Sequence, residues 1–289
     1  MAYVRAEDGT RLHYQVWGRG EPLLLVHGLG TDLRGWLPQR RAFGSRYRCI
    51  AFDNRGVGAS DKPPGPYDLE AMADDALRVL AASGHESAHV VGVSMGGILA
   101  QMVAVRAPER VRSLTLACTA CRHLPWRREL LAEWAEVATT EGMGTFVRDN
   151  MRWLVGPRSL RRVWPLATLI APLVLNVPPH AFAAQVAAIL ATDDAMADEL
   201  AAITAPTLVT VGSQDILTPR GDSEELAERI PGAELVVVRG GAHLFQLEHV
   251  GTFNRIVRQH LDAASAASEP SSAPGDRAAT APRQDVVEA

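Results

Sequence analysis

The chain has 289 residues, of which 47% are hydrophobic, enough for a sizeable core in one large domain or two modest ones. Its 29 basic and 33 acidic residues give a formal net charge of −4. Nucleic acid and anionic membranes bind basic surfaces, so we expect neither as a general partner. Three cysteines are too few for a disulfide-stapled secreted scaffold.

The N-terminus shows no apolar signal-peptide core, which favours a cytoplasmic protein. The longest apolar stretch, Leu166 to Val177, has 12 residues and contains Pro172. A bilayer-spanning helix needs about 20 residues, so we expect no stable membrane anchoring. A lipase-like contact of this stretch with lipid is an alternative that its proline and short length disfavour. The oligomeric state is left open.

The predicted elements begin with a hairpin, Tyr3–Ala6 and Leu12–Trp17, around Asp8-Gly9. Buried strands follow at Pro22–Val26, Arg48–Phe52, His89–Val93, Ser113–Cys118, Thr207–Val211 and Glu234–Val238. Helical patterns lie near Leu33–Phe43, Leu69–Ser83, Met95–Arg106, Ser223–Arg229 and Val250–Leu261. Strands covered on both faces are continuously apolar, so this alternation predicts an α/β fold with a mostly parallel sheet flanked by helices.

Residues 122–204 interrupt this alternation, because they show helical patterns and four tryptophans but no convincing strand. We interpret them as a helical cap inserted into a sheet domain made of residues 1–121 and 205–262. Residues 263–289 are rich in Ala, Ser and Pro and contain no aromatic residue, Leu or Ile. Such a segment buries too little apolar surface to offset its ordering entropy, so we predict a disordered tail.

The strongest local motif is Gly92-Val93-Ser94-Met95-Gly96-Gly97, a G-x-S-x-G between a predicted strand and a predicted helix. A sharp strand-to-helix turn presents the serine hydroxyl above the sheet edge, and its glycines remove Cβ atoms that would clash. A glycine-rich turn with an incidental serine is the alternative. The flanking strand and helix favour the catalytic interpretation, so Ser94 is the predicted nucleophile.

A serine hydroxyl needs a neighbouring base, and the base needs a carboxylate to orient it. His243 and Asp215 each follow a predicted strand, where the carboxyl ends of parallel strands converge. Asp222 and Glu248 are rival acids, although helix capping explains each of them. His27 is considered below. The other seven histidines are expected to have surface or packing roles: His13, His85, His89, His123, His180, His249 and His260.

An acyl-transfer site also needs two donors aimed at the developing oxyanion. We predict the backbone N–H of Met95, at the start of a helix, as one donor. The second is the N–H of Leu29, in the loop His27-Gly28-Leu29-Gly30 after a strand. His27 and Gly28 of this loop are expected at the substrate, together with unidentified cap residues. An ordinary turn between a strand and a helix is the alternative for this loop.

With these motifs in order over residues 1–262, the chain resembles the α/β-hydrolase-fold serine hydrolases, whose triads run Ser, acid, His along the sequence. Within that family it is similar to 3-oxoadipate enol-lactonases and bacterial carboxylesterases. The resemblance implies hydrolysis of a small-molecule carboxylic ester or lactone through an acyl-Ser94 intermediate, without a metal or other cofactor. It also implies that the loop Asp53–Ser60 is mainly structural.

Three alternatives share the same fold and triad. The site could cleave a C–C bond, make peracids as a cofactor-free perhydrolase or haloperoxidase, or serve as a ligand receptor that turns over slowly. Residues 122–162 also hold eight arginines, one of which could pair with a substrate carboxylate, although solvated helix surface is the simpler interpretation. Cys118-Thr119-Ala120-Cys121 is interpreted as packing, because one C-x-x-C pair cannot close a four-ligand zinc site.

Overall fold

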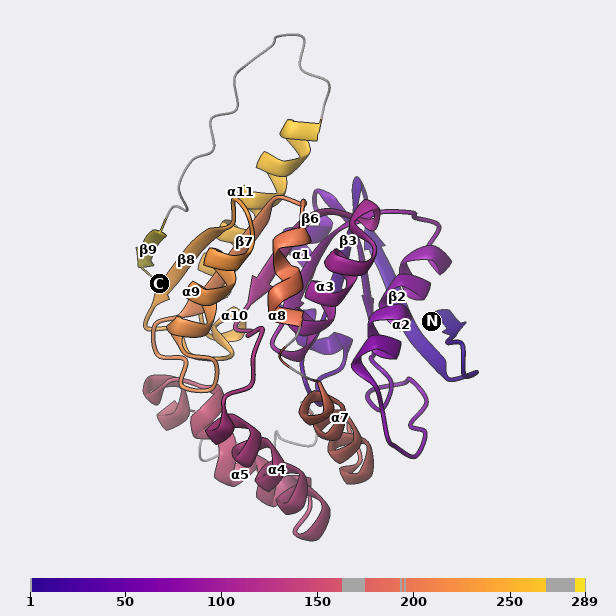
Figure 1. Ribbon diagram of the computed structural model, residues 1–289, viewed down its shortest axis with the longest axis vertical. Helices are drawn as coiled ribbons and strands as arrows, with labels where there is room; N and C mark the ends of the chain where they lie inside the picture. The colour runs from indigo at the N-terminus through magenta and orange to yellow at the C-terminus, as the bar shows by residue number, and fades with distance from the viewer. Residues whose placement is uncertain (1, 163–174, 193, 195, 269–283, 289) are drawn as a thin grey trace.

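The computed structural model describes residues 2–162, 175–192, 194, 196–268 and 284–288. A nine-stranded sheet with the order β1-β2-β4-β3-β5-β6-β7-β8-β9 forms its centre (Figure 1). Only the pairings of β1 with β2 and of β2 with β4 are antiparallel. The predicted α/β fold with a mostly parallel sheet and an N-terminal edge hairpin is therefore confirmed.

The strands follow the apolar runs of the sequence closely. Their bounds are β1 (Ala2–Arg5), β2 (Arg11–Gly18), β3 (Glu21–Val26), β4 (Tyr47–Phe52), β5 (Ala88–Val93), β6 (Val111–Ala117), β7 (Thr207–Gly212), β8 (Glu234–Arg239) and β9 (Gln284–Glu288). Every residue of β5 and β7 is buried, as expected for parallel strands covered by helices on both faces.

Helices cover both faces of the sheet. They are η1 (Leu33–Trp36), α1 (Arg40–Gly44), α2 (Leu69–Ala82), α3 (Met95–Arg106), η2 (Pro108–Arg110), α9 (Arg220–Arg229), α10 (Phe245–Glu248) and α11 (Val250–Ser268). Helices α2, α3 and α9 lie on one face, and α1 and α11 pack together on the other (Figure 1). One helix was expected over Leu33–Phe43, but two short ones form there, because Gly35 and Pro38 interrupt the pattern.

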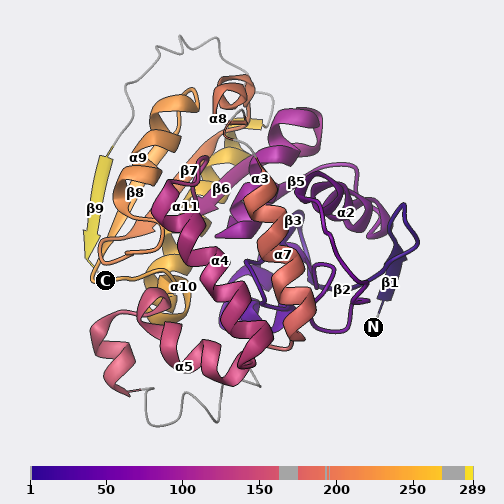
Figure 2. The ribbon, with the colours of Figure 1, turned by 60° about the horizontal axis from the view of Figure 1, so that its bottom comes forward.

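A group of helices from the predicted cap lies across the carboxyl ends of the strands. These are α4 (Pro125–Thr140), α5 (Met143–Leu154) and α7 (Pro179–Ala191), with α4 and α7 side by side (Figure 2). The following α8 (Met196–Glu199) and η3 (Leu200–Ala202) belong to the sheet layer, because η3 packs on α3 and α9. The cap boundary at residue 204 stays a prediction.

The C-terminal segment differs from the predicted disordered tail in two places. Helix α11 continues past Leu261 to Ser268, because its alanines favour a helix even without much burial. Gln284–Glu288 add β9 alongside β8, where Val286 pairs with Val237. The tail prediction is wrong for these two stretches, while residues 269–283 lie outside the described part of the chain.

Within the described residues, no helix combines the length and the apolar character needed to cross a membrane. The stretch Leu166 to Val177, considered above as a lipid contact, lies mostly outside the described residues.

Candidate active site

Ser94 occupies the turn between β5 and α3 with strained backbone angles, φ 55° and ψ −123°. Both backbone polar groups of Ser94 form hydrogen bonds that hold the turn. The Ser94 N–H donates to the carbonyl of Ala117 at 3.0 Å, and the Thr119 hydroxyl donates to the Ser94 carbonyl at 2.8 Å. The end of strand β6 and the residues just after it therefore fix the backbone of Ser94.

The glycines around Ser94 are required by close backbone approaches. A Cβ added to Gly92 would lie 2.3 Å from the carbonyl oxygen of Gly96. A Cβ added to Gly96 would lie 2.3 Å from the carbonyl oxygen of Val26 in β3. The G-x-S-x-G pattern is thus a steric requirement of this turn, as the sequence predicts.

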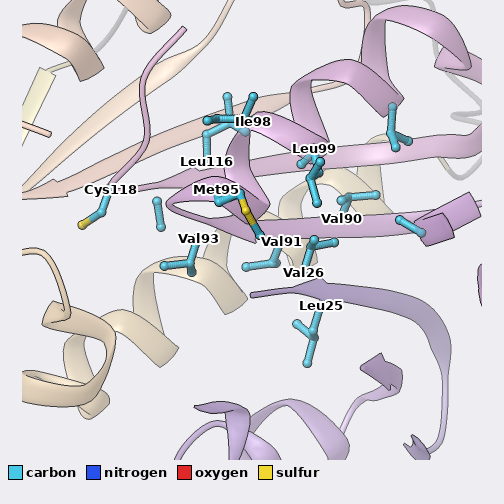
Figure 3. Close-up of a cluster of buried hydrophobic side chains, with 14 of the residues drawn as sticks. Leu25, Val26, Val90, Val91, Val93, Met95, Ile98, Leu99, Leu116 and Cys118 are labelled. Atoms are coloured by element: carbon cyan, nitrogen blue, oxygen red, sulfur yellow. The ribbon is translucent and has the colours of Figure 1, made fainter. Parts of the chain in front are cut away.

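Apolar burial at the start of α3 outweighs the backbone strain at Ser94. A left-handed non-glycine residue costs roughly 1–3 kcal/mol. Met95, Ile98 and Leu99 are each at most 4% exposed and join side chains of β3 and β5 in one cluster (Figure 3). Each such side chain contributes roughly 1.5–3 kcal/mol on burial, so three of them more than offset the strain.

The structure brings Ser94, His243 and Asp215 into one hydrogen-bonded line. His243 Nε2 lies 3.0 Å from Ser94 Oγ, and His243 Nδ1 lies 2.9 Å from Asp215 Oδ2. His243 follows β8 and Asp215 follows β7, so the carboxyl ends of three strands supply the three side chains. This is the arrangement of a nucleophile, its base and the group that orients the base.

Four donors surround the Asp215 carboxylate. Oδ1 accepts from the N–H groups of Leu217 and Thr218, both at 2.9 Å, while Oδ2 accepts from the Thr218 hydroxyl at 2.7 Å and from His243. Burial by itself would raise the pKa of Asp215, but His243 and the hydrogen bonds from Thr218 outweigh it and hold the pKa below its ordinary value of 3.8. The carboxylate is therefore ionised beside His243.

The rival acids have other partners. Glu248 accepts from the N–H groups of Gly156 at 2.9 Å and Ala242 at 3.1 Å, and so holds the loop before His243. Asp222 pairs with Arg127 of α4. Two of the other histidines also have structural partners, His13 with Asp53 and His89 with Ser113.

The loop after β3 lies against Ser94. A Cβ added to Gly28 would be 3.5 Å from Ser94 Oγ, and Leu29 and Met95 both line the cavity at the serine. His27 is buried at the edge of this cavity, and its Nδ1 accepts from the Gly28 N–H at 2.8 Å. Burial lowers the pKa of His27 to about 4, so its ring is neutral.

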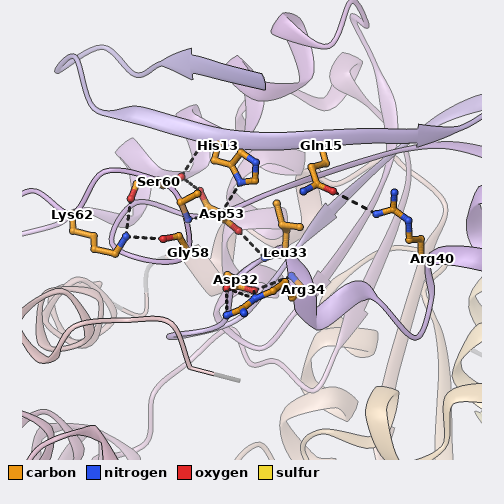
Figure 4. Close-up of polar contacts among 11 residues, drawn as sticks. His13, Gln15, Asp32, Leu33, Arg34, Arg40, Asp53, Gly58, Ser60 and Lys62 are labelled. Carbon is orange, nitrogen blue, oxygen red and sulfur yellow. Dashed lines mark hydrogen bonds and ion pairs between the residues drawn. The ribbon is translucent and has the colours of Figure 1, made fainter. Parts of the chain in front are cut away.

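Asp53 fixes the far end of this loop (Figure 4). Its Oδ1 accepts from the Leu33 N–H at 2.8 Å, and its Oδ2 lies 2.8 Å from His13 Nδ1 and accepts from the Ala59 N–H at 2.8 Å. Ser60 donates to the Asp53 carbonyl at 2.6 Å. These contacts connect the edge hairpin, the loop after β4 and the loop after β3, which agrees with a structural role for Asp53–Ser60.

A cavity of about 550 Å³ opens between the sheet and the cap at Ser94. Its walls are mainly apolar, and α4, α5 and α7 supply Arg127, Leu131, Trp134, Phe146, Val147, Met151, Leu154, Phe182 and Ile189. Of the cap tryptophans, Trp134 faces this cavity, whereas Trp126 and Trp153 stack on each other with centroids 6.2 Å apart. Trp164 lies outside the described residues.

The cysteines are free thiols buried in the core. Among the described residues, Cys118, Asp215 and His243 form one group of possible metal ligands. Their ligand atoms lie within 4.8 Å of one another. Asp215 and His243 are already bonded to each other, and burial raises the pKa of the Cys118 thiol well above 9, which keeps it protonated. This donor chemistry suits packing behind Asp215 better than metal binding.

Sequence reasoning missed three contacts around the site. The Thr218 hydroxyl supports Asp215 from three residues away, while Gln185 of α7 contacts Gly30 and Arg127 of α4 pairs with Asp222 over more than 90 positions. The one available signal was Thr218 itself, a hydroxyl three residues after the predicted acid. The others are polar residues on helices, a pattern that solvated surface residues share.

Known proteins resemble this chain over nearly its whole length. It is 34% identical over 259 residues to a carbamate hydrolase named RutD of Azorhizobium caulinodans, covering 89% of this chain and 97% of the relative. It is 29% identical over 256 residues to 3-oxoadipate enol-lactonase 1 of Acinetobacter baylyi, covering 88% and 94%. The crystal structure of the enol-lactonase from Burkholderia xenovorans superposes with a TM-score of 0.83 at 29% identity, covering 90% of this chain and 100% of that one.

The family model described as the alpha/beta hydrolase fold matches residues 21–250, a range that includes Ser94, Asp215 and His243. Together with the sheet order and the turn at Ser94, this match shows that the chain belongs to the α/β-hydrolase fold family.

Proposed function

We propose that this protein is a serine hydrolase that cleaves a carboxylic ester or lactone through an acyl-Ser94 intermediate. The observation that carries the proposal is the hydrogen-bonded line from Ser94 through His243 to Asp215 at the wall of an apolar cavity. Relatives named as hydrolases support the reaction class.

In the first half of the reaction, His243 Nε2 takes the proton of Ser94 Oγ as this oxygen attacks the carbonyl carbon. The N–H groups of Leu29 and Met95 stabilise the negative charge on the carbonyl oxygen, each by about 3 kcal/mol. His243 then gives its proton to the leaving oxygen, and the bond between that oxygen and the acyl carbon breaks.

In the second half, His243 takes a proton from water as the water oxygen attacks the acyl carbon. The ester bond to Ser94 breaks, and the proton returns from His243 to Ser94 Oγ. Asp215 holds the Nδ1–H of His243 and stabilises the imidazolium in both halves. The sequence of steps requires no metal ion or organic cofactor.

Covalent labelling with a fluorophosphonate tests the nucleophile, and a burst of 4-nitrophenol from 4-nitrophenyl butyrate tests acylation. We expect stoichiometric labelling of Ser94 and steady turnover after the burst. Ser94→Ala should remove both and lower kcat by about 10⁴-fold or more while the protein stays folded. Labelling without turnover would support the receptor alternative, and an active Ser94→Ala variant would end the covalent mechanism.

Carbamate hydrolysis is a second candidate, favoured by the relative named as a carbamate hydrolase. A carbamate carbonyl would acylate Ser94 in the same way but leave a carbamoyl-serine, which water attacks more slowly. A 4-nitrophenyl N-alkylcarbamate separates the two functions. One burst followed by lasting inactivation supports the esterase, whereas continued turnover supports the carbamate hydrolase.

The C–C hydrolase and perhydrolase alternatives use the same three side chains and differ in substrate. Product analysis with a lactone, an aryl ester, a vinylogous diketone and an ester plus hydrogen peroxide distinguishes them. We expect acid and alcohol from the ester, ring-opened acid from the lactone, and no cleavage of the diketone.

A further inference from the structure

The cap arginine that reaches the cavity wall is already paired. Arg127 is 2% exposed and forms an ion pair with Asp222 of α9. Its Nε donates to the carbonyl of Leu217 and its Nη1 to the carbonyl of Arg122, both at 2.9 Å. The guanidinium is therefore held by three protein acceptors, and its charge is balanced inside the protein.

The second arginine at the cavity, Arg34, is also neutralised. Its guanidinium lies 2.7 Å from Asp32, and that carboxylate is 4% exposed whereas the arginine is 46% exposed. Among the described residues that line the cavity, Arg34 and Arg127 are the two arginines, and none is a lysine, aspartate or glutamate. The undescribed stretch 163–174 has no charged residue in its sequence.

Two of the histidines at the cavity add no positive charge. Burial lowers the pKa of His27 to about 4. Burial, reinforced by Arg127 and Arg128, lowers the pKa of His123 to about 4 as well. Both rings are therefore neutral in the ordinary working range of pH.

A carboxylate in this cavity would lose its hydration without gaining a free cation. Removing an ion from water is strongly unfavourable even after relaxation, and only a well-placed opposite charge offsets that cost. An alkyl group at the same place instead gains burial free energy with each CH₂ that it places against the walls formed by Leu131, Phe146 and Phe182.

We propose that the site takes uncharged esters with an apolar acyl chain and rejects esters whose acyl chain ends in a carboxylate, because Asp222 neutralises Arg127 at the cavity wall. This inference rests on the serine-hydrolase function proposed above. It differs from the alternative raised by the sequence, in which a cap arginine binds a substrate carboxylate, since Arg127 reaches the cavity wall but its charge is already paired with Asp222.

Two esters of equal acyl length test the substrate class: 4-nitrophenyl hexanoate and the mono-4-nitrophenyl ester of adipic acid. We expect kcat/KM for the neutral ester to exceed that for the anionic ester by about 100-fold or more. Equal values, or a preference for the anionic ester, would overturn the inference and leave the hydrolase function standing. Failure to cleave either ester, without fluorophosphonate labelling, would instead count against the hydrolase function.

Asp222→Asn tests the role of the ion pair. It keeps the shape and a carbonyl acceptor for Arg127 but removes the negative charge, so a positive charge stands uncompensated at the wall. The ratio of kcat/KM for the anionic ester to that for the neutral ester should rise about 10-fold or more. Asp149→Asn, on the cap but in an exposed pair with Arg148, removes the same charge and should leave the ratio unchanged.

An unchanged ratio in folded Asp222→Asn would overturn the assignment to Asp222. If this variant does not fold, the double variant Arg127→Met/Asp222→Leu removes both charges together and leaves no buried charge unpaired. It should keep the preference for the neutral ester. A double variant that prefers the anionic ester would contradict the proposal in the same way.

Discussion

Gln185 of the cap helix α7 holds the loop that carries Leu29. Its Oε1 accepts a hydrogen bond from the Gly30 N–H at 2.9 Å, and its Nε2 donates to the Arg55 carbonyl at 2.8 Å. The side chain is fully buried. One amide therefore connects the cap with two loops of the sheet domain, next to the N–H proposed to bind the oxyanion.

Replacing Gln185 with Met should impair catalysis more than binding. The substitution keeps the volume but leaves the Gly30 N–H and the Arg55 carbonyl without partners, at about 1–3 kcal/mol of unfolding free energy. Because the Leu29 N–H then loses its fixed position, kcat should fall about 10-fold while KM changes little. Steady-state kinetics and urea unfolding measure the two effects.

Gln15→Met is the matched control, because Gln15 contacts Arg40 near the surface, away from the cavity. It should leave kcat unchanged. Equal kcat in Gln185→Met and the wild type, with reduced stability, would reduce Gln185 to a purely structural residue.

Asp215→Asn should lower kcat by about 10⁴-fold, because an amide cannot accept the Nδ1–H of His243 and all the other donors at once. Thr218→Val removes only the hydroxyl that donates to Asp215 Oδ2 at 2.7 Å, so we expect a loss of about 10-fold. The graded pair is measured with 4-nitrophenyl butyrate. A larger loss in Thr218→Val than in Asp215→Asn would contradict the assignment of the acid.

Histidines whose rings are poorly solvated in the folded protein should make it less stable in mild acid. Burial lowers the pKa of His27, His123 and His260 to about 4 in the folded protein. Their ordinary value is about 6.5, so below that pH the unfolded chain binds protons that the folded chain does not. The free energy of unfolding should therefore fall as the pH drops from 6.5 towards 4, by about 1.4 kcal/mol per pH unit for each histidine.

Urea unfolding of His260→Gln at pH 7 and pH 5 checks this expectation. Between these values the variant should lose about 2 kcal/mol less stability than the wild type, since one proton-binding group has been removed from the unfolded chain. The matched control variant is His180→Gln, which replaces an exposed histidine. An identical pH dependence in His260→Gln and the wild type would rule out this origin of acid sensitivity.

The three thiols should be inert in the native state. Burial raises the pKa of Cys49 and Cys121 to about 12 and that of Cys118 well above its ordinary value, and only the thiolate reacts with disulfides. Titration with Ellman's reagent at pH 8 should find almost no reactive thiol in the folded protein and three in denaturant. A native thiol that reacts within minutes would revive redox chemistry for the C-x-x-C pair.

The parts of the fold that follow local rules could be predicted from the sequence. The apolar runs predicted the positions of β3 to β8 within one or two residues. The glycines around Ser94 predicted the turn, because a Cβ atom at their positions would clash with the backbone. Asp215 and His243 could be chosen because residues just after parallel strands meet at one sheet edge. Each of these inferences uses only neighbours in the chain.

The parts that depend on distant contacts could not be predicted. Whether Arg127 faces solvent or Asp222 depends on how α4 lies against α9, and no local pattern encodes that placement. The same holds for Gln185, whose partner Gly30 lies 155 residues away. Likewise, β9 requires β8 as a neighbour, so its residues alone resemble an ordinary polar tail.

The three acceptors of Arg127 divide two tasks between separate atoms. The carbonyl of Leu217 secures helix α4 against the loop after β7, the carbonyl of Arg122 secures it against the segment before the helix, and the Asp222 carboxylate balances the charge. A single substitution at Asp222 could thus alter the electrostatics of the pocket while the cap stays attached. A single substitution could therefore change the substrate preference during evolution, because it alters the charge of the cavity wall and leaves the fold in place.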